Sequence, residues 1–550
     1  MAEAGDTVPR PTRSAVSAVR HGFRSALGNK PVERVALALL AIGCLLRALH
    51  FLGGRSLWLD EAMVADSIVH RDWAGLLAPL SYSQVAPLGW LMVERASFLL
   101  LGGSDMALRA PALLAGLASL LLFAGAARRS FESYGYLIAI ATFAVSDVLV
   151  FYSAEVKPYG FDALVAVAAL AFAAHYLPED KPLRTRDYIV LLLAGLASVF
   201  VSFPAAFILA GLGGALFLRD VFKRRWTHAL GIAAVSSVWL LAFAWLLLRL
   251  RQSASDNVAE MTSSWAGAYA PIQPSGLGEL KWYARAVMDA LEYMFGQESM
   301  IAWAVAIAIG AVLTIRSKFY LAVALLTPLA GALVASGFQL YPFSGRLLLF
   351  AAPALMFLAV VGVQAAVSAF KSPLAGSLIA VLLLLYGPAH RLWGAFTYYP
   401  APFATEHVLP VMQTMSGHAD VDAVFVNLAG LPAYRHYQQR AGLADLTVIE
   451  STGSRTSLGC LLADMEIVSR HHRVWVFYSH AGRVVGDTPE DVVFTQIADA
   501  TGRRLQSIDL ISVHAYLYEF DEASAQSISA LRNATSVAGA CNARSPSGVE

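Results

Sequence analysis

The chain has 550 residues, of which 57% are hydrophobic and 14% are charged, and its formal net charge is +1. This composition excludes a water-soluble fold over most of the length and indicates a polytopic membrane protein. The near-zero charge gives no indication of a nucleic-acid partner. The three cysteines lack the spacing of a metal or redox site, so these residues do not indicate the chemistry of the chain.

The amino-terminal segment, residues 1–33, is basic and has no apolar core of its own. It carries Arg10, Arg13, Arg20, Arg24 and Lys30. A cleaved signal peptide would combine such charges with an apolar run. We therefore expect this segment to be a cytoplasmic tail.

Eleven apolar runs follow that are long enough to cross a membrane, which takes about 17 to 25 residues each. They are residues 34–52, 109–127, 134–152, 161–178, 187–203, 204–219, 229–249, 299–314, 318–337, 346–367 and 373–389. Another apolar run, 86–102, contains Glu94 and Arg95 at its centre. Because charges are costly in hydrocarbon, we expect that run to lie along the membrane interface.

The basic clusters between the spans support this arrangement. With eleven spans, they all lie on the side of the amino-terminal tail, as the positive-inside bias predicts. They are Arg128–Arg129, Lys181 with Arg184 and Arg186, Arg219 with Lys223 to Arg225, Arg316 with Lys318, and Lys371. The sequence therefore predicts an amino terminus in the cytoplasm and a carboxyl terminus outside.

Four loops fall on the outer side in this topology. Residues 53–108 form the first and contain the acidic pair Asp60–Glu61; the other three are 152–162, 250–298 and 341–346. Within the third, the apolar residues between Lys281 and Phe295 recur at near-helical spacing, which predicts a helix lying on the membrane surface.

From about residue 390 the apolar runs become short. Segments 422–428, 446–450, 473–479 and 514–520 are typical of strands separated by helices, which predicts a small three-layer α/β domain over 390–520. No glycine-rich phosphate loop follows these strands. We expect the polar segment 521–550 to be disordered. Cys460 and Cys541 either form a disulfide or remain free thiols.

The acidic pair Asp60–Glu61 directly follows the first span. Such a pair indicates chemistry at the membrane interface, or else two helix-capping acids. Five more ionisable groups fall at the same boundary: Arg109, Glu155, Lys157, Asp162 and Arg346. Acids offer a general base and cations offer donors to a phosphate, although each group also has a local explanation such as snorkelling or capping.

Four stretches in this order resemble a known family. They are SLWLDEA (56–62), APLGWLMVERASFLLLGGSDMALRAPALLAG (86–116), FYSAEVKPYGFDAL (151–164) and YPFSGRLLLFAAPAL (341–355). The set resembles the GT-C membrane glycosyltransferases, in particular the family-39-like group with protein O-mannosyltransferases and the aminoarabinose transferase that acts on lipid A. The resemblance implies a GT-C transmembrane catalytic domain over 34–389, with about eleven transmembrane helices, interfacial helices and a periplasmic α/β domain.

The resemblance also implies a reaction and its residues. It implies an inverting transfer of a sugar from a polyprenyl-phosphate donor to a glycan, lipid or protein acceptor, at the periplasmic face of a bacterial inner membrane. Asp60 would be the essential acid with Glu61 beside it, and the second acid would be Glu155 or Asp162, of which we prefer Glu155. Substrate contacts would come from Trp58, Arg109, Lys157, Tyr159, Asp162, Tyr341 and Arg346. With no clear DxD motif we expect no metal, although related oligosaccharyltransferases use a divalent one.

Two alternatives remain at this point. One is an oligosaccharide transferase or ligase with a lipid diphosphate donor. The other is a lipid flippase or transporter, for which charges at mid-membrane and internal symmetry are typical. Only Arg47 and His50, in the outer part of the first span, depart from the clustering of charges at one face.

Overall fold

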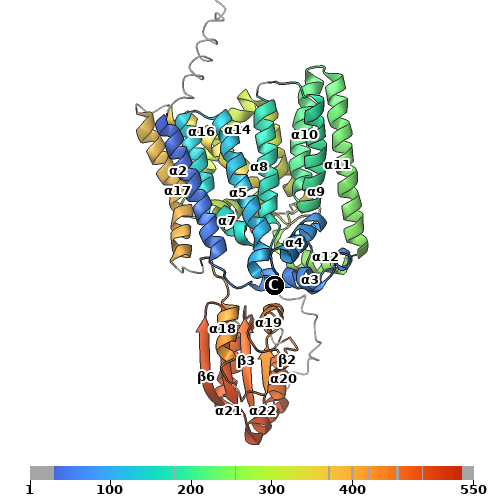
Figure 1. Cartoon of the computed structure of the whole chain (residues 1–550), viewed down its shortest axis with the longest axis vertical. Coiled ribbons are helices and arrows are strands. Elements are labelled where there is room, and N and C mark those ends of the chain that lie inside the picture. Colours follow the sequence, from blue (N-terminus) through green and yellow to red (C-terminus); the bar gives the residue numbers. More distant parts are fainter. Residues whose placement is uncertain are drawn as a thin grey trace, which may run out of the picture.

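The computed structural model describes residues 30–534 except 179, 254, 275, 369–371, 398–401, 419, 454–456 and 486. A bundle of long helices comes first and an α/β region follows it, and Figure 1 shows the strands gathered beyond one end of the bundle. We call this end of the bundle the loop end, because α3, α4 and α12 lie there (Figure 1). The tail up to residue 29, Lys371 and Cys541 lie outside the described residues.

Nine helices in the described part are long and apolar enough to cross a membrane. They are α2 (Lys30–Leu52), α5 (Asp105–Ser130), α8 (Tyr159–Tyr176), α10 (Ala205–Phe222), α11 (Trp226–Ser253), α14 (Met300–Ser317), α15 (Phe319–Gly337), α16 (Ala352–Val367) with the preceding 3-10 helix η6 (Gly345–Ala351), and α17 (Pro373–Phe396). A tenth span is formed if the bent pair α6 (Ser133–Ala144) and α7 (Asp147–Phe151), with η4 (Tyr152–Ala154), counts as one. The protein is thus a polytopic helical membrane protein.

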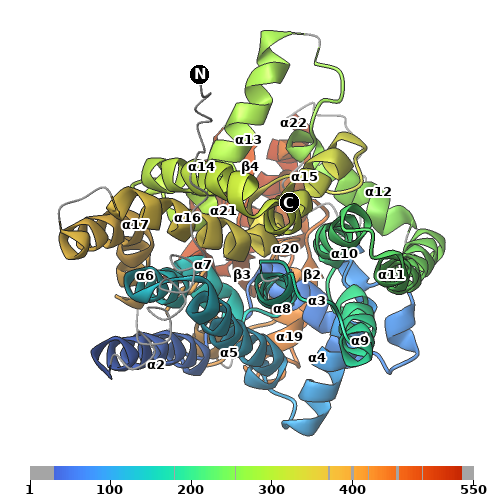
Figure 2. The same cartoon turned by 90° about the horizontal axis from the view of Figure 1, so that it is seen from above.

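The sequence predicted eleven spans, and the two predicted runs that are not among the nine helices correspond to the bent pair α6–α7 and to one short helix. The predicted run 187–203 forms α9 (Thr185–Val201), which has 17 residues. It is one residue shorter than α8, α10 and α14, which have 18 residues each and are among the nine. Length and composition therefore support nine or ten spans in the described residues, with α9 packed beside α10 and α11 (Figure 2).

A buried arginine caps the break between α6 and α7, which are bent by 54°. Arg47 of α2 donates to the carbonyls of Phe143 and Ala144, at 3.3 and 3.2 Å. The last carbonyls of a helix have no partner within it, and here a guanidinium provides one. This contact explains why Arg47, one of the two polar exceptions within the first predicted span, is tolerated there.

The predicted interfacial segment forms helices too short to cross. Between α2 and α5 lie α3 (Leu59–His70), the single turns η2 (Gly75–Leu77) and η3 (Ser81–Ser83), and α4 (Leu88–Leu100). With 13 residues, α4 is about 20 Å long. Arg95 of α4 donates to the carbonyls of Ile68 and Val69, both at 2.8 Å, and so closes the end of α3. The predicted surface helix 281–295 is part of α13 (Leu277–Phe295), which extends outward from the bundle (Figure 2).

The C-terminal region contains a mixed five-stranded sheet in the order β2-β1-β3-β7-β6. Its strands are β1 (Ala423–Val426), β2 (Thr447–Glu450), β3 (Arg473–Ser479), β6 (Arg503–Leu510) and β7 (Val513–Glu519). β1 is parallel to β2 and β3, whereas β7 is antiparallel to β3 and β6. The four predicted strands are present, and β4 (Arg483–Val485) pairs with β5 (Thr488–Pro489) separately.

Helices cover both faces of this sheet. Val424 and Val426 pack with α18 (Val408–Met415) and α19 (Leu431–Tyr437). Ala423 and Phe425 face the opposite way and pack with α20 (Leu458–Val468), α21 (Glu490–Thr501) and α22 (Glu522–Ala534). Since successive side chains of a strand point to opposite faces, the region has the three predicted layers.

One expectation for this region was wrong. The start of the segment predicted to be disordered forms α22, and Ile528 is fully buried against the sheet layer. The helix was not expected because it is mostly polar and presents a single large apolar side chain to the core. Residues 535–550 lie outside the described residues.

Candidate active site

The acidic pair lies in the first turn of α3, at the loop end of the bundle. Trp58 precedes the helix in an extended conformation, and its backbone N–H donates to Glu61 at 3.4 Å. Negative charge in the first turn is favoured by the helix dipole. The two acids nevertheless have different surroundings, which indicates that they have different roles.

Glu61 is fully buried within a cluster of cations and backbone donors. Its carboxylate accepts from Arg55 at 2.8 Å, from Arg109 at 2.7 and 3.1 Å, and from the backbone N–H of Val156 at 2.8 Å. Burial alone would raise the pKa of Glu61, but the guanidinium groups of Arg109 and Arg55 outweigh it and hold the pKa below its usual range. Glu61 thus stays charged and joins three separate segments of the chain.

Arg109, in the first turns of α5, belongs to the same cluster and donates all of its hydrogen bonds among the described residues within it. Besides Glu61, it donates to the carbonyl of Arg55 at 2.6 Å and to that of Ser56 at 3.2 Å. Its side chain is 2% exposed. Its guanidinium therefore fixes the loop before α3.

Glu155 lies on the opposite side of Arg55. It forms an ion pair with Arg55 and accepts from the indole N–H of Trp58 at 3.0 Å. Burial raises the pKa of Glu155, and Arg55 offsets only part of this effect. The other candidate for the second acid, Asp162, is buried in the first turn of α8 and forms no ion pair with any described residue.

Asp60 faces a different set of groups. Its Oδ2 lies 2.6 Å from Nη1 of Arg346, which comes from η6. Burial alone would raise the pKa of Asp60, but Lys157, Arg346 and His480 outweigh it, and the pKa is lowered. Asp60 is therefore ionised at neutral pH and lies among cations.

Aromatic rings surround Arg346. The centroids of Trp58, Tyr159 and Trp265 lie 5.9, 6.0 and 5.6 Å from its guanidinium carbon. Lys157 donates to the side-chain oxygen of Gln84 at 2.9 Å. The predicted residue Tyr341 instead packs beside η6 and donates to the carbonyl of Leu347 at 2.7 Å. The structure thus pairs Asp60 with Arg346, which lies among aromatic rings, and places Lys157 near enough to lower the pKa of Asp60.

No protein-family model and no curated protein sequence matches the chain. Solved structures do match. An oligosaccharyltransferase from Archaeoglobus fulgidus, in complex with Zn and sulfate, is 16% identical, with 80% of this chain and 67% of that chain covered and a TM-score of 0.49. ArnT from Cupriavidus metallidurans, bound to undecaprenyl phosphate, is 12% identical, with 88% and 97% covered and a TM-score of 0.49.

The chain is structurally similar to GT-C membrane glycosyltransferases. The four sequence stretches resemble the same group of enzymes. At these identities and TM-scores the similarity does not extend to the reaction, which depends on the side chains of the site.

Several residues that shape the site were not predicted. Arg55 is one, and Glu406 of the C-terminal region is another. Glu406 is 2% exposed and accepts from the backbone N–H of Leu59 at 3.2 Å, from the hydroxyl of Ser479 at 2.9 Å and from Nδ1 of His480 at 3.2 Å. The one available signal was that Ser479 ends a strand, since the carboxyl ends of parallel strands commonly carry sites.

The C-terminal region contacts the start of α3 at two further points. The hydroxyl of Tyr437 accepts from the backbone N–H of Leu57 at 2.7 Å, and the hydroxyl of Ser56 accepts from that of Leu409 at 3.1 Å. These contacts hold the residues directly before Asp60. Among the described residues, no three His, Cys, Asp or Glu side chains are grouped as for a metal ion.

Proposed function

We propose that the protein is a glycosyltransferase that moves a sugar from a polyprenyl-phosphate donor to the hydroxyl of an acceptor. The observation that carries this proposal is the pairing of Asp60 with Arg346 beside Lys157, inside an enclosure of aromatic rings. A general base next to phosphate-binding cations is the combination that glycosyl transfer from a phosphate requires.

Arg346 and Lys157 are the groups that bind the donor phosphate. A guanidinium offers two parallel N–H donors to phosphate oxygens, and an ammonium adds a compact positive charge. Arg346 opens a helix that continues into the bilayer, so a phosphate at this depth leaves its prenyl chain in the hydrocarbon. The rings of Trp58, Tyr159 and Trp265 then enclose the sugar.

Asp60 is the general base in this mechanism. The acceptor oxygen attacks the anomeric carbon from the face opposite the phosphate, and its proton passes to the Asp60 carboxylate. The new carbon–oxygen bond forms as the bond to the phosphate oxygen breaks, so the anomeric configuration inverts. The departing phosphate takes the electron pair, and the cations stabilise its charge.

Because Asp60 pairs with Arg346, binding of the donor also changes the basicity of Asp60. The donor phosphate is another anion for the same guanidinium, and its binding draws Arg346 away from Asp60. The partly uncovered carboxylate then becomes a stronger base, because a cation that had lowered its pKa has turned to the phosphate. Donor therefore binds before acceptor.

The role proposed for Glu61 and Arg109 differs from a direct contact with substrate. Within the described part of the chain, the hydrogen bonds of Arg109 go to Glu61 and to the backbone carbonyls of residues 55 and 56. We infer that Glu61 and Arg109 hold the loop that carries Asp60, and that Glu155 orients Trp58 through its indole N–H.

The orientation in the membrane is also part of the proposal. The basic clusters Arg128–Arg129 and Arg316–Lys318 lie at helix ends opposite to the loop end. Positive-inside bias then places the site and the α/β domain on the outer side of a bacterial inner membrane. The proposed catalytic domain covers 34–389, and α22 extends the α/β domain beyond 520.

The replacement Asp60→Asn tests the proposed base. It removes the charge and keeps the shape, so we expect transfer to fall at least a hundredfold, as for loss of a general base. The measurement is transfer of radiolabelled sugar from polyprenyl-phosphate donors by the purified protein. Asp66→Asn on the same helix is the matched control, and both variants are checked for thermal unfolding. A folded Asp60→Asn protein that transfers sugar at the normal rate would exclude this base.

A further inference from the structure

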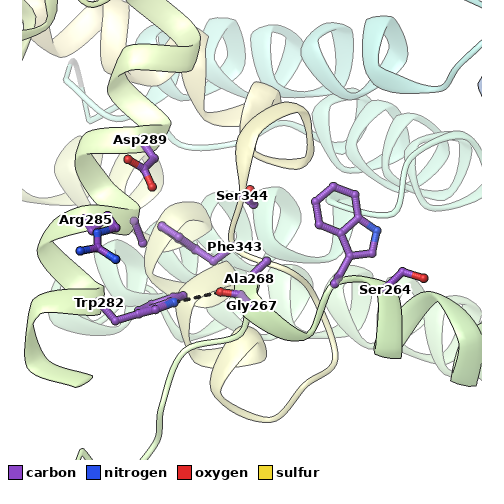
Figure 3. Close-up of a pocket in the computed structure, with 10 residues that line it drawn as sticks. Ser264, Gly267, Ala268, Trp282, Arg285, Asp289, Phe343 and Ser344 are labelled. Atoms are coloured by element: carbon purple, nitrogen blue, oxygen red, sulfur yellow. Dashed lines mark hydrogen bonds between the residues drawn. The ribbon is translucent and has the colours of Figure 1, made fainter. Parts of the chain in front are cut away.

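A pocket that is lined in part by Trp265 adjoins the proposed reaction centre, because the same ring lies 5.6 Å from the guanidinium carbon of Arg346. It has a volume of about 320 Å³ and lies between α13, the turn η5 (Ala266–Ala268) and the loop before η6 (Figure 3). This volume is at the lower end of the roughly 300 to 1,000 Å³ of small-molecule sites. The side chains that the argument uses are Ser264, Trp265, Trp282, Arg285, Asp289 and Phe343.

One wall of the pocket is a single face of α13. Trp282, Arg285 and Asp289 are spaced by three and four residues, so they follow one another along that face (Figure 3). Neither Arg285 nor Asp289 has an ion-pair partner among the residues that the structure describes. Both charges are thus available to a ligand.

The opposite wall is held in place by hydrogen bonds. The indole N–H of Trp282 donates to the carbonyl of Gly267 at 3.1 Å, as Figure 3 shows. The backbone N–H of Phe343 donates to the carbonyl of Ala268 at 2.9 Å. These bonds connect α13, η5 and the loop before η6, so the pocket is formed in advance of a ligand.

The lining of this pocket suits a pyranose ring. Such a ring has an apolar face of C–H groups, which packs against aromatic rings, and hydroxyl groups around its edge. Trp265, Trp282 and Phe343 offer the rings, while a guanidinium and a carboxylate offer charge-assisted hydrogen bonds to adjacent hydroxyls. A free phosphate fits less well, because Asp289 repels it, and a prenyl chain would leave both charges without a partner.

The position of the pocket indicates which unit of the substrate it binds. The ring of Trp265 lies 5.6 Å from the guanidinium carbon of Arg346, and Arg346 pairs with Asp60 at 2.6 Å. Trp265 thus lines the pocket and also lies beside the cation that pairs with Asp60. We propose that the pocket binds a pyranose unit of the substrate next to the sugar that is transferred. This inference rests on the proposed function and makes one substrate a glycan.

Binding of sugars can be measured without any transfer. Saturation-transfer NMR with a panel of methyl pyranosides is recorded on the purified full-length protein. We expect at least one pyranoside to receive saturation on its C–H face, and Trp282→Ala to weaken its binding about tenfold, as for loss of one stacked ring. Trp282→Phe keeps a ring and restores part of the signal. Trp226→Ala, at an exposed tryptophan of α11, leaves it unchanged.

The exposed carboxylate gives a variant with little risk to folding. Asp289→Asn is expected to weaken the same pyranoside severalfold, whereas Asp60→Asn leaves its binding intact. Absence of a signal from every pyranoside, or a full signal in both Trp282→Ala and Asp289→Asn, overturns the proposal. A positive signal in a protein that transfers no sugar would instead contradict the proposed function alone.

Transfer kinetics then identify which substrate supplies the neighbouring unit. If it belongs to the acceptor, Asp289→Asn raises the KM for a glycan acceptor and leaves that for the donor unchanged. If it belongs to the glycan of the donor, the donor KM rises instead. Unchanged values for both substrates, measured with a multi-sugar donor and a glycan acceptor, count against the pocket as a subsite.

Discussion

At the scale of single residues, two neighbouring acids differ because of the cations around them. Glu61 has its oxygens occupied by Arg55, Arg109 and a backbone N–H, whereas Asp60 meets Arg346 at the edge of an aromatic enclosure. Breaking a buried ion pair leaves an uncompensated charge, while altering a partly exposed pair costs far less. The two acids should therefore respond differently to replacement of their partners.

Arg109→Met tests the structural role of the buried cluster. It leaves Glu61 with Arg55 as its one ion-pair partner among the described residues and removes the donors to residues 55 and 56, so we expect the free energy of unfolding to fall by about 3–5 kcal/mol. Thermal unfolding in detergent measures this change, and Arg440→Met, at an exposed ion pair with Asp105, is the control. A variant of normal stability with a raised donor KM would show instead that Arg109 binds substrate.

The sequence indicated some of these residues and not others. Asp60 and Arg346 were predicted because each is a charge beside an apolar span. In the structure, Oδ2 of Asp60 lies 2.6 Å from Nη1 of Arg346. Arg55 and Glu406 carry no such local signal, since one lies in a short loop and the other in a polar region. Their positions depend on pairings between segments about 100 and 350 residues apart in the chain, which periodicity does not report.

At the scale of elements, the apolar pattern predicted an element where apolar residues follow one another in the sequence. The four predicted strands have such runs, including the exposed edge strand β2, whereas the edge strand β6 has mostly exposed, charged and polar side chains. The same reason explains α22, whose buried face is narrow.

The start of α3 is held by a hydrogen bond from the C-terminal region, and Glu406→Ala tests whether α3 depends on it. The change removes the acceptor of the Leu59 N–H, and a hydrogen bond to a charged group contributes about 1.5–3 kcal/mol. If the bond positions Asp60, we expect kcat to fall about tenfold to a hundredfold with little change in either KM.

Glu406→Gln keeps an acceptor oxygen and should restore much of this rate, which a general loss of stability would not predict. Glu450→Gln, at an exposed acid of the same region, is the matched control. Normal kcat in Glu406→Ala would show that the contact does not position the base.

At the scale of the whole molecule, charge separates the two ends of the bundle. The loop end carries the site, and the opposite end carries the arginine and lysine clusters of the short connections. Labelling with a membrane-impermeant maleimide tests the proposed orientation, in a protein whose native cysteines are replaced by serine. We expect Asp72→Cys to be labelled in intact spheroplasts and Arg129→Cys only after the membrane is opened. The reverse pattern would place the site in the cytoplasm.

The hydrogen bond between Glu406 and Leu59 also has a consequence for biogenesis. During translation, α3 is synthesised more than three hundred residues before Glu406, whose carboxylate binds the backbone N–H of Leu59 in its first turn. A nascent or truncated chain can thus insert all of its apolar helices and still lack an ordered base. Under the proposed function, a chain that stops before Glu406 lacks the acceptor that positions Asp60, and such an unfinished copy would not consume the activated lipid.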